Sequence, residues 1–355
     1  MIKIPFCKSF IDGKEVRAVS RVLKSGWLTT GSKCAEFEKN FAEYVGSKYA
    51  VSVSSGTAAI KLSLKYFTQN MDSITVACPS LTFIATAAEI KNCGHSVKFI
   101  DIDSDNLCLD PDQLPYNVDI VMPVHLTGVE AFTAYNKPVV EDSAHRLIKN
   151  QCKKMPVNHL ATFSFYPTKP ITTGEGGMIA TNDVEAYVWL KMARNHGIDK
   201  EDIRRYGKSD GWKYKIDFVG EKANMSDLQA AIGIEQLKKL PLMDKKRQVI
   251  VDKYNKILGY KNYGLHLYPI FVNDRDKFVH FLHEHGIGVS VHFQSLHKMK
   301  AFKEHNHLTL PMTEWASNHI VSLPLYPTLK DADIRYICGK IKKTKLLIPL
   351  KDLYE

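Results

Sequence analysis

The first half of the chain alternates short β-rich runs with helical stretches, and this alternation constrains the fold more than any other feature. The first run, Tyr49–Val53, leads into a helix that opens at Ser55. Such alternation is typical of a mainly parallel sheet covered by helices, so we predict an α/β fold. The other elements expected here are strands Ile74–Cys78, Val97–Asp101, Ile120–Val124, Pro138–Glu141, Thr162–Phe165 and Met178–Thr181, and helices Phe83–Lys91 and Asp183–Asn195.

The pattern changes near residue 240. A helix capped by Ser226 is expected over Leu228–Leu240 and should end at Pro241, because proline cannot continue the hydrogen-bond ladder. A charged helix over Leu242–Leu258 should lead into a smaller α+β region. We therefore predict two domains, 1–240 and 241–355. The smaller region should contain a strand near Val289–Phe293 and a final helix near Asp331–Lys342.

Composition excludes several classes of protein. Apolar residues make up 45% and charged residues 24% of the 355 residues, which argues against disordered and fibrous chains. No apolar run approaches the roughly 18 residues that a membrane span needs. Residues 1–16 lack the apolar core of a signal peptide, so we expect a cytoplasmic protein without membrane contact.

Charge and cysteine content exclude two further kinds of site. The net charge of +10 is spread along the chain, and no nucleic-acid-binding motif accompanies it, so no nucleic-acid partner is expected. The seven cysteines are widely spaced without a C-x-x-C pair. This pattern argues against a disulfide framework and against a zinc site, and we expect reduced cysteines and no metal.

A lysine between two prolines stands in the most informative segment, Phe163–Gly177. Lys169 follows a strand on a loop, where Pro170 favours an extended backbone, and the glycines beyond it let the backbone pass close to a bulky group. A lysine constrained in this way can act as an amine nucleophile toward an aldehyde. Alone, a lysine near glycines is more often a surface charge, so the prediction depends on its neighbours.

Two residues that follow the strand Pro138–Glu141 strengthen this hypothesis. Asp142 lies at the carboxyl edge, where open α/β sheets bind ligands. A carboxylate there can keep a pyridine nitrogen protonated and make the ring an electron sink, although a helix-capping aspartate is the alternative. His145 can lie beside the same ring or be a structural histidine.

The segment Ser54–Ala59 lies between a strand and a helix, whose N-terminus offers backbone N–H groups to a phosphate. By itself this signal is weak, since many α/β turns look alike. Phe83, at the start of the next helix, can stack on an aromatic ring or pack in the core.

These segments, taken in order with others, resemble the sugar aminotransferase family known as DegT/DnrJ/EryC1/StrS. The resemblance covers nearly the whole chain and implies the aspartate-aminotransferase-like fold, type I among pyridoxal-phosphate enzymes. A large domain with a central, mainly parallel seven-stranded sheet and a smaller α+β C-terminal domain are then expected. The matching segments are Ser25–Gly31, Ser55–Ala59, Pro79–Ala87, Pro123–Gly128, Glu141–His145, the lysine segment, Arg194–Gly197, Asn224–Ala231 and Ser322–Pro327.

The resemblance also implies a cofactor and roles for single residues. The cofactor is pyridoxal 5'-phosphate, with pyridoxamine 5'-phosphate as its amino-carrying form; Lys169 would bind it covalently, and Asp142 would pair with its pyridine nitrogen. Asn224 would reach the phosphate of the neighbouring subunit, which implies a homodimer with shared sites. The other implied contacts are Gly56, Thr57, Ala58 and Ser164 to the phosphate, Phe83 and His145 to the ring, and Thr29 and His292 to the sugar.

The implied reaction moves an amino group from L-glutamate to a nucleoside-diphosphate 4-keto-6-deoxyhexose, giving a 4-amino-4,6-dideoxy sugar. UDP- or dTDP-4-keto-6-deoxy-glucose is the leading substrate. A 3-keto sugar or a keto-inositol is the alternative within the class, and a non-catalytic cofactor-binding regulator is the alternative outside it. Family members that dehydrate carry a histidine in place of Lys169, so the lysine favours amino transfer. The family's Gly-Ala-rich stretch is replaced by Leu147–Asn150, which predicts an altered loop.

Overall fold

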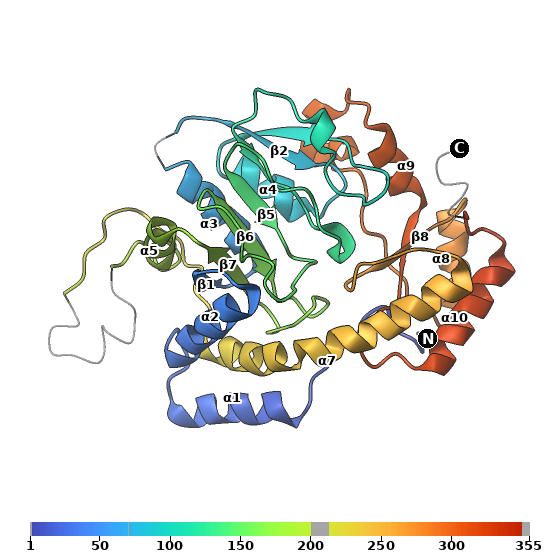
Figure 1. Cartoon of the computed structure of the whole chain (residues 1–355), viewed down its shortest axis with the longest axis horizontal. Helices are drawn as coiled ribbons and strands as arrows, with labels where there is room; N and C mark the ends of the chain where they lie inside the picture. The colour runs from blue at the N-terminus through green and yellow to red at the C-terminus, as the bar shows by residue number, and fades with distance from the viewer. Residues whose placement is uncertain (1, 70, 200–212, 350–355) are drawn as a thin grey trace.

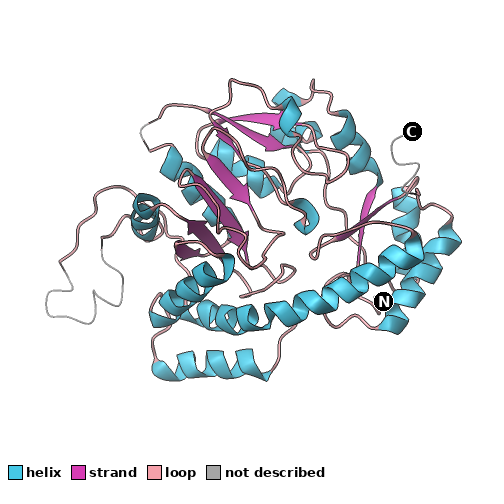
Figure 2. Cartoon of the chain, viewed as in Figure 1, coloured by secondary structure: helices cyan, strands magenta, loops and turns pink. Residues whose placement is uncertain are grey.

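The computed structural model describes residues 2–69, 71–199 and 213–349. Helices surround a central sheet, and a smaller unit follows at the C-terminal end of a long helix (Figure 1, Figure 2). Within the described residues, no helix is long and apolar enough to cross a membrane. All seven cysteines are free, as the sequence predicted.

The central sheet has seven strands in the order β1-β7-β6-β5-β4-β2-β3. Strand β7 runs antiparallel to both of its neighbours, and the remaining pairs are parallel. The predicted mainly parallel α/β sheet is therefore confirmed. The strands are β1 (Tyr49–Val53), β2 (Thr75–Pro79), β3 (Ser96–Ile100), β4 (Ile120–Val121), β5 (Val139–Asp142), β6 (His159–Ser164) and β7 (Gly177–Thr181).

Helices bury both faces of this sheet, which explains why its strands are almost continuously apolar. On one face, Val53 of β1 and Leu160 of β6 pack against α3 (Gly56–Phe67) and α5 (Val184–Ala193), and α4 (Ile84–Asn92) continues this layer. On the other face, Phe163 and its neighbours pack against two further helices. These are α2 (Ser32–Val45) and α7 (Asp227–Leu258); α1 (Gly13–Ser25) packs on α7 from outside.

The long helix α7 corrects one expectation. Its 32 residues run through Pro241 without ending there. Proline removes one backbone donor, but Leu240 and Met243 on either side of it stay buried in the same core, and this packing outweighs the lost hydrogen bond. The predicted N-cap is confirmed, because the Ser226 side chain accepts a hydrogen bond from the N–H of Gln229. The domain boundary near residue 240 stays a prediction.

The C-terminal unit differs from the prediction in its strands. Residues 289–293 form no strand; Ser290 makes only an isolated bridge to Ser322. The two-stranded antiparallel sheet instead consists of β8 (Tyr268–Phe271) and β9 (Ile320–Leu323), which the sequence had not indicated. The predicted final helix is confirmed as α10. The helices of this unit are α8 (Arg275–Glu284), α9 (Pro311–His319) and α10 (Asp331–Thr344), and the short 3-10 helices of the chain are Pro111–Gln113, Leu126–Gly128, Leu296–Lys298 and Lys300–His305.

Candidate active site

The carboxyl ends of β5 and β6 and the N-terminus of α3 meet at a cavity of about 410 Å³. This is the edge at which the parallel strands of an α/β sheet present their last residues. Most of the residues that the sequence singled out line this cavity although they are far apart in the chain. They are Gly56, Thr57, Phe83, Asp142, His145, Ser164, Lys169 and His292.

Lys169 lies on the loop between β6 and β7, where its backbone N–H donates to the carbonyl of Tyr166 at 2.9 Å. Burial of its amine lowers the pKa of Lys169 to about 8, although the negative charge of Asp142 acts in the opposite direction. Lysine is a nucleophile only as the neutral amine, so this environment favours the reactive form near neutral pH.

Asp142 is the last residue of β5 and is buried. Its Oδ2 accepts a hydrogen bond from the Thr86 hydroxyl at 2.8 Å, and its Oδ1 accepts one from the N–H of Ala144 at 3.1 Å. The Thr86 oxygen lies 2.9 Å from the Thr82 hydroxyl, which must donate to it because the Thr86 hydrogen is already used. This series of hydrogen bonds orients the Asp142 carboxylate. Its remaining lone pairs can still accept a hydrogen bond from a group in the cavity.

The N-terminus of α3 forms the polar end of the cavity. Its N-cap, Ser55, accepts from the N–H of Ala58 at 3.0 Å, which leaves the N–H groups of Gly56 and Thr57 without an acceptor among the described residues. A Cβ on Gly56 would lie only 2.8 Å from the Cβ of Ser164, so glycine is required for this close approach. The N–H groups of Gly56 and Thr57, the hydroxyl of Ser164 and the dipole of α3 together suit a phosphate.

Aromatic rings and imidazoles also line the cavity. Phe83 is 55% exposed, and its ring lies 5.9 Å from that of Phe293. The ring centroids of His145 and His266 are 4.4 Å apart. Burial, reinforced by the positive charge of Lys169, holds the pKa of both histidines well below the usual value and lowers the pKa of His292 to about 4. All three imidazoles are therefore neutral at pH 7 and offer one donor and one acceptor each.

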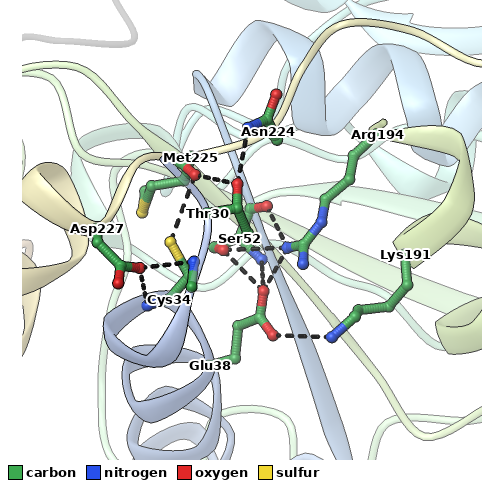
Figure 3. A network of polar contacts seen from close by, with 10 residues as sticks. Thr30, Cys34, Glu38, Ser52, Lys191, Arg194, Asn224, Met225 and Asp227 are labelled. Carbon is green, nitrogen blue, oxygen red and sulfur yellow. Dashed lines mark hydrogen bonds and ion pairs between the residues drawn. The ribbon is translucent and has the colours of Figure 1, made fainter. Parts of the chain in front are cut away.

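Three predicted contacts lie elsewhere in the same chain. Ala58 is not among the residues that line the cavity, and its N–H donates to the Ser55 cap. Asn224 and Thr29 lie outside this cavity, near the start of α7. The amide nitrogen of Asn224 donates to the hydroxyl of Thr30 at 2.7 Å, and that hydroxyl donates to the carbonyl of Met225 at 2.6 Å (Figure 3).

A buried polar network holds this second region in place. Glu38 accepts hydrogen bonds from the Ser52 hydroxyl at 2.7 Å and from Arg194 (Figure 3). Burial acts to raise the pKa of Glu38, but the charges of Arg194 and Lys191 outweigh it and keep the pKa below its usual value. The Glu38 carboxylate is therefore charged at neutral pH and ties α2 to β1 and to the end of α5.

Two further residues of the candidate site escaped the sequence-based prediction. Thr86 orients Asp142, yet it lies 56 positions before it and looks like any helix residue. His266 lines the cavity beside Lys169, but it stands in a region that the sequence marked only as part of a small α+β unit. The one available signal was a histidine next to the apolar run of β8, which is too common to decide a role.

The residues present fit a pyridoxal phosphate. The free donors at the start of α3 suit its phosphate, the oriented Asp142 carboxylate suits a protonated pyridine nitrogen, and the partly deprotonated Lys169 suits its aldehyde. The cavity is also within the roughly 300–1,000 Å³ typical of small-molecule sites. This fold and this set of groups define a pyridoxal-phosphate-dependent enzyme.

The chain belongs to the DegT/DnrJ/EryC1/StrS aminotransferase family, whose model matches residues 9–342. It is 34% identical over 370 residues to the spore coat polysaccharide biosynthesis protein SpsC of Bacillus subtilis, covering 93% of this chain and 94% of that protein.

Solved structures agree with this assignment. PseC of Helicobacter pylori, an aminotransferase involved in the biosynthesis of pseudoaminic acid, has a TM-score of 0.86 at 25% identity and covers 96% of this chain and 98% of its own. Spr1654 of Streptococcus pneumoniae, named as a sugar aminotransferase, has a TM-score of 0.84 in its PMP form at 25% identity, with coverage of 96% and 98%. Its PLP form is also solved. The protein is thus a sugar aminotransferase with pyridoxal 5'-phosphate as its cofactor.

Proposed function

We propose that this sugar aminotransferase moves an amino group from L-glutamate to C4 of a nucleoside-diphosphate 4-keto-6-deoxyhexose, with UDP- or dTDP-4-keto-6-deoxy-glucose as the first substrate to test. The product is then a 4-amino-4,6-dideoxy sugar. The observation that carries the proposal is the presence of Lys169 and an oriented Asp142 in the wall of one cavity. The resemblance of the lysine segment to 4-aminating members supports the position of amination.

When bound, pyridoxal phosphate supplies an aldehyde that accepts the amino group and a ring that withdraws electrons. Lys169 then has two tasks. Its amine holds the resting cofactor, and once released it moves a proton between the α-carbon of the substrate and the cofactor. A pKa near 8 suits both tasks, because the amine can lose and regain a proton close to neutral pH.

Asp142 keeps a proton on the pyridine nitrogen through the charge of its carboxylate. Thr86 and the N–H of Ala144 hold that carboxylate in one orientation, so it need not rearrange during the reaction. The N–H groups of Gly56 and Thr57, with Ser164, would hold the phosphate, and Phe83 would stack on the ring. His145 lines the same cavity, and its neutral imidazole could donate a hydrogen bond to the ring hydroxyl or accept one from it.

The sugar side of the site is proposed to involve two subunits. His292 lines the cavity, and its Nδ1 lies 2.9 Å from the hydroxyl of Ser322, which fixes the ring orientation. Thr29 and Asn224 lie outside the cavity of their own chain, and this position supports a homodimer in which each chain supplies them to the partner's site.

The substrate is tested by offering the holoenzyme a panel of nucleotide-linked keto sugars with L-glutamate and identifying the products by mass spectrometry. The panel contains 4-keto-6-deoxy and 3-keto hexoses linked to UDP, dTDP and GDP, with a keto-inositol beside them. A mass consistent with replacement of the 4-keto oxygen by an amine supports the proposal, and exclusive turnover of a 3-keto sugar or the keto-inositol contradicts it.

A half-reaction separates an enzyme from a cofactor-binding regulator. Addition of L-glutamate alone should bleach the absorbance of the lysine-bound cofactor, at roughly 410–430 nm, and release 2-oxoglutarate. The Lys169→Ala variant is the matched control and should show neither change. A wild-type protein that binds the cofactor but stays unchanged with every amino donor would be a regulator.

A further inference from the structure

The loop that carries Lys169 is held by side chains from other parts of the chain. Neither Pro167 nor Pro170 has a backbone N–H, so this loop has few donors with which to anchor itself. Its carbonyls are used instead: Pro167 accepts from the hydroxyl of Ser9 at 2.9 Å, and Pro170 accepts from Nη2 of Arg247 at 2.9 Å. The guanidinium of Arg247, on α7, thus donates to the carbonyl of the residue that directly follows Lys169.

Arg247 lies beneath this loop and is only 6% exposed. Its Nη1 lies 3.0 Å from Oδ1 of Asp244, one turn earlier on α7. Together with Lys169 and His266 it lines a small cavity between the loop and the helix. Its guanidinium therefore connects α7 to the residue directly after the reactive lysine.

The ion pair with Asp244 does not explain this burial. Burial raises the pKa of Asp244 to about 6 and lowers the pKa of Arg247, so desolvation outweighs the attraction between the two charges. A buried pair of this kind is commonly no more stable than apolar side chains of similar volume. What the guanidinium adds, and an apolar side chain would lack, is a planar donor set that reaches the carbonyl of Pro170.

The position of Arg247 along α7 gives this contact a further consequence. Met243, four residues earlier, packs in the core of the large unit, whereas Ile250 and Val251 pack in the core of the C-terminal unit. Arg247 lies between these two groups. Its hydrogen bond therefore ties the lysine loop to the stretch of α7 where one core ends and the other begins.

We propose that Arg247 is a positioning residue for Lys169, which holds the lysine loop through the carbonyl of Pro170 so that the amine points into the cavity. The inference rests on the proposed function in one respect, namely that Lys169 reacts with the aldehyde of pyridoxal phosphate. Arg247 is not among the residues that line the cavity proposed for the cofactor, so it would act through the loop rather than by direct contact.

The test compares the uptake of pyridoxal phosphate by cofactor-free protein in four variants. Arg247→Met and Arg247→Gln remove the contact, because methionine has no donor and glutamine is too short. Arg247→Lys keeps one donor, and Lys245→Met is the control, since Lys245 is exposed on the same helix. Uptake is followed by the absorbance of the lysine-bound cofactor, and borohydride reduction with peptide mass spectrometry shows that Lys169 is labelled.

We expect Arg247→Met and Arg247→Gln to slow uptake about tenfold or more, since a displacement of about 1 Å at a reacting group costs up to ~100-fold. They should also shift the pH midpoint of the absorbance change in the loaded protein. Arg247→Lys should recover part of the rate, and Lys245→Met should match the wild type.

Three other results would contradict the proposed role of Arg247. Uptake at the wild-type rate and an unchanged midpoint in Arg247→Met would show that Arg247 has only a structural role, whatever the melting temperature. If Arg247→Met does not fold, the same result in Arg247→Gln overturns the proposal. Failure of the wild type to load Lys169 would instead refute the proposed function and this inference with it.

Discussion

At the scale of single residues, the reactivity of Lys169 depends on the balance between burial and one carboxylate. Burial lowers its pKa to about 8, and Asp142 opposes that shift. Because only the neutral amine attacks an aldehyde, cofactor uptake by the empty protein should rise with pH and level off above about pH 8 rather than near the ordinary lysine value of about 10.4. Stopped-flow absorbance across this range measures the profile.

The Asp142→Asn variant checks the sign of this effect. Without the negative charge of Asp142, burial should lower the pKa of Lys169 further. The plateau of cofactor uptake should therefore begin at a lower pH than in the wild type. A plateau that moves upward, or a wild-type profile still rising at about pH 10, contradicts the assigned environment of Lys169.

Thr86 should matter for catalysis although it does not line the cavity. The Thr86→Val variant keeps the shape but leaves Oδ2 of Asp142 without its hydroxyl donor. A lost hydrogen bond to a charged group costs about 1.5–3 kcal/mol, so we expect kcat to fall by roughly tenfold or more. Steady-state assays with the accepted sugar measure it. Thr86→Ser keeps the donor and should stay close to the wild type; equal loss in both variants would point to packing instead.

At the scale of secondary-structure elements, α2 depends on a cap supplied by another helix. Its N-cap, Gly31, has no side chain, and the carboxylate of Asp227 accepts instead from the N–H groups of Gly31, Lys33 and Cys34 at 2.9, 3.1 and 2.9 Å. Figure 3 shows Asp227 beside Cys34 at the start of α2. This contact joins the starts of α2 and α7, next to Thr30 and Asn224. The cap therefore also positions the residues proposed to reach the partner subunit.

Removal of this charge should destabilise the protein. In Asp227→Asn only one side-chain oxygen remains as an acceptor, and the favourable interaction with the helix dipole is lost. We expect the free energy of unfolding to fall by about 1–2 kcal/mol, measured by urea denaturation. Glu43→Gln, at an exposed position of α2, the helix that Asp227 caps, is the control and should change the free energy of unfolding by less than about 0.5 kcal/mol. Equal stability of the two variants would rule out the cap.

At the scale of the whole molecule, the residues proposed for one active site fall into two groups. Lys169, Asp142 and the residues proposed to bind the phosphate line one cavity, whereas Asn224 and Thr29 lie outside it, where the Asn224 amide donates to Thr30. A homodimer with shared sites would unite the two groups, each chain supplying the second group to its partner.

Mixed dimers test this arrangement. Lys169→Ala and Asn224→Ala should each be nearly inactive alone, but a mixed dimer would hold one intact site beside one doubly defective site. Purification through two affinity tags isolates the mixed dimer, in which one of the two sites is intact, so about half of wild-type activity should return. The measurement is activity after co-expression and co-purification with two affinity tags. No recovery in the purified mixed dimer would place both residues in the site of the same chain.

The sequence by itself determined the α/β class, most strands of the central sheet, and most of the residues that line the cavity. These features depend on local signals: alternating β-rich and helical runs, a capped helix start at Ser226, and the constrained setting of Lys169. The resemblance to the sugar aminotransferases supplied the cofactor, because its motifs follow the order of the chain.

Only the tertiary structure decided what holds these residues in place. Thr86 meets Asp142 and Arg247 meets Pro170 across 56 and 77 positions of chain, so no local pattern could indicate either contact. The same holds for α7, which continues through Pro241 because its buried face outweighs one missing hydrogen bond. Residue types and periodicity determine which elements can form, but packing between distant segments decides which of them meet, and so sets the pKa of Lys169 and the orientation of Asp142.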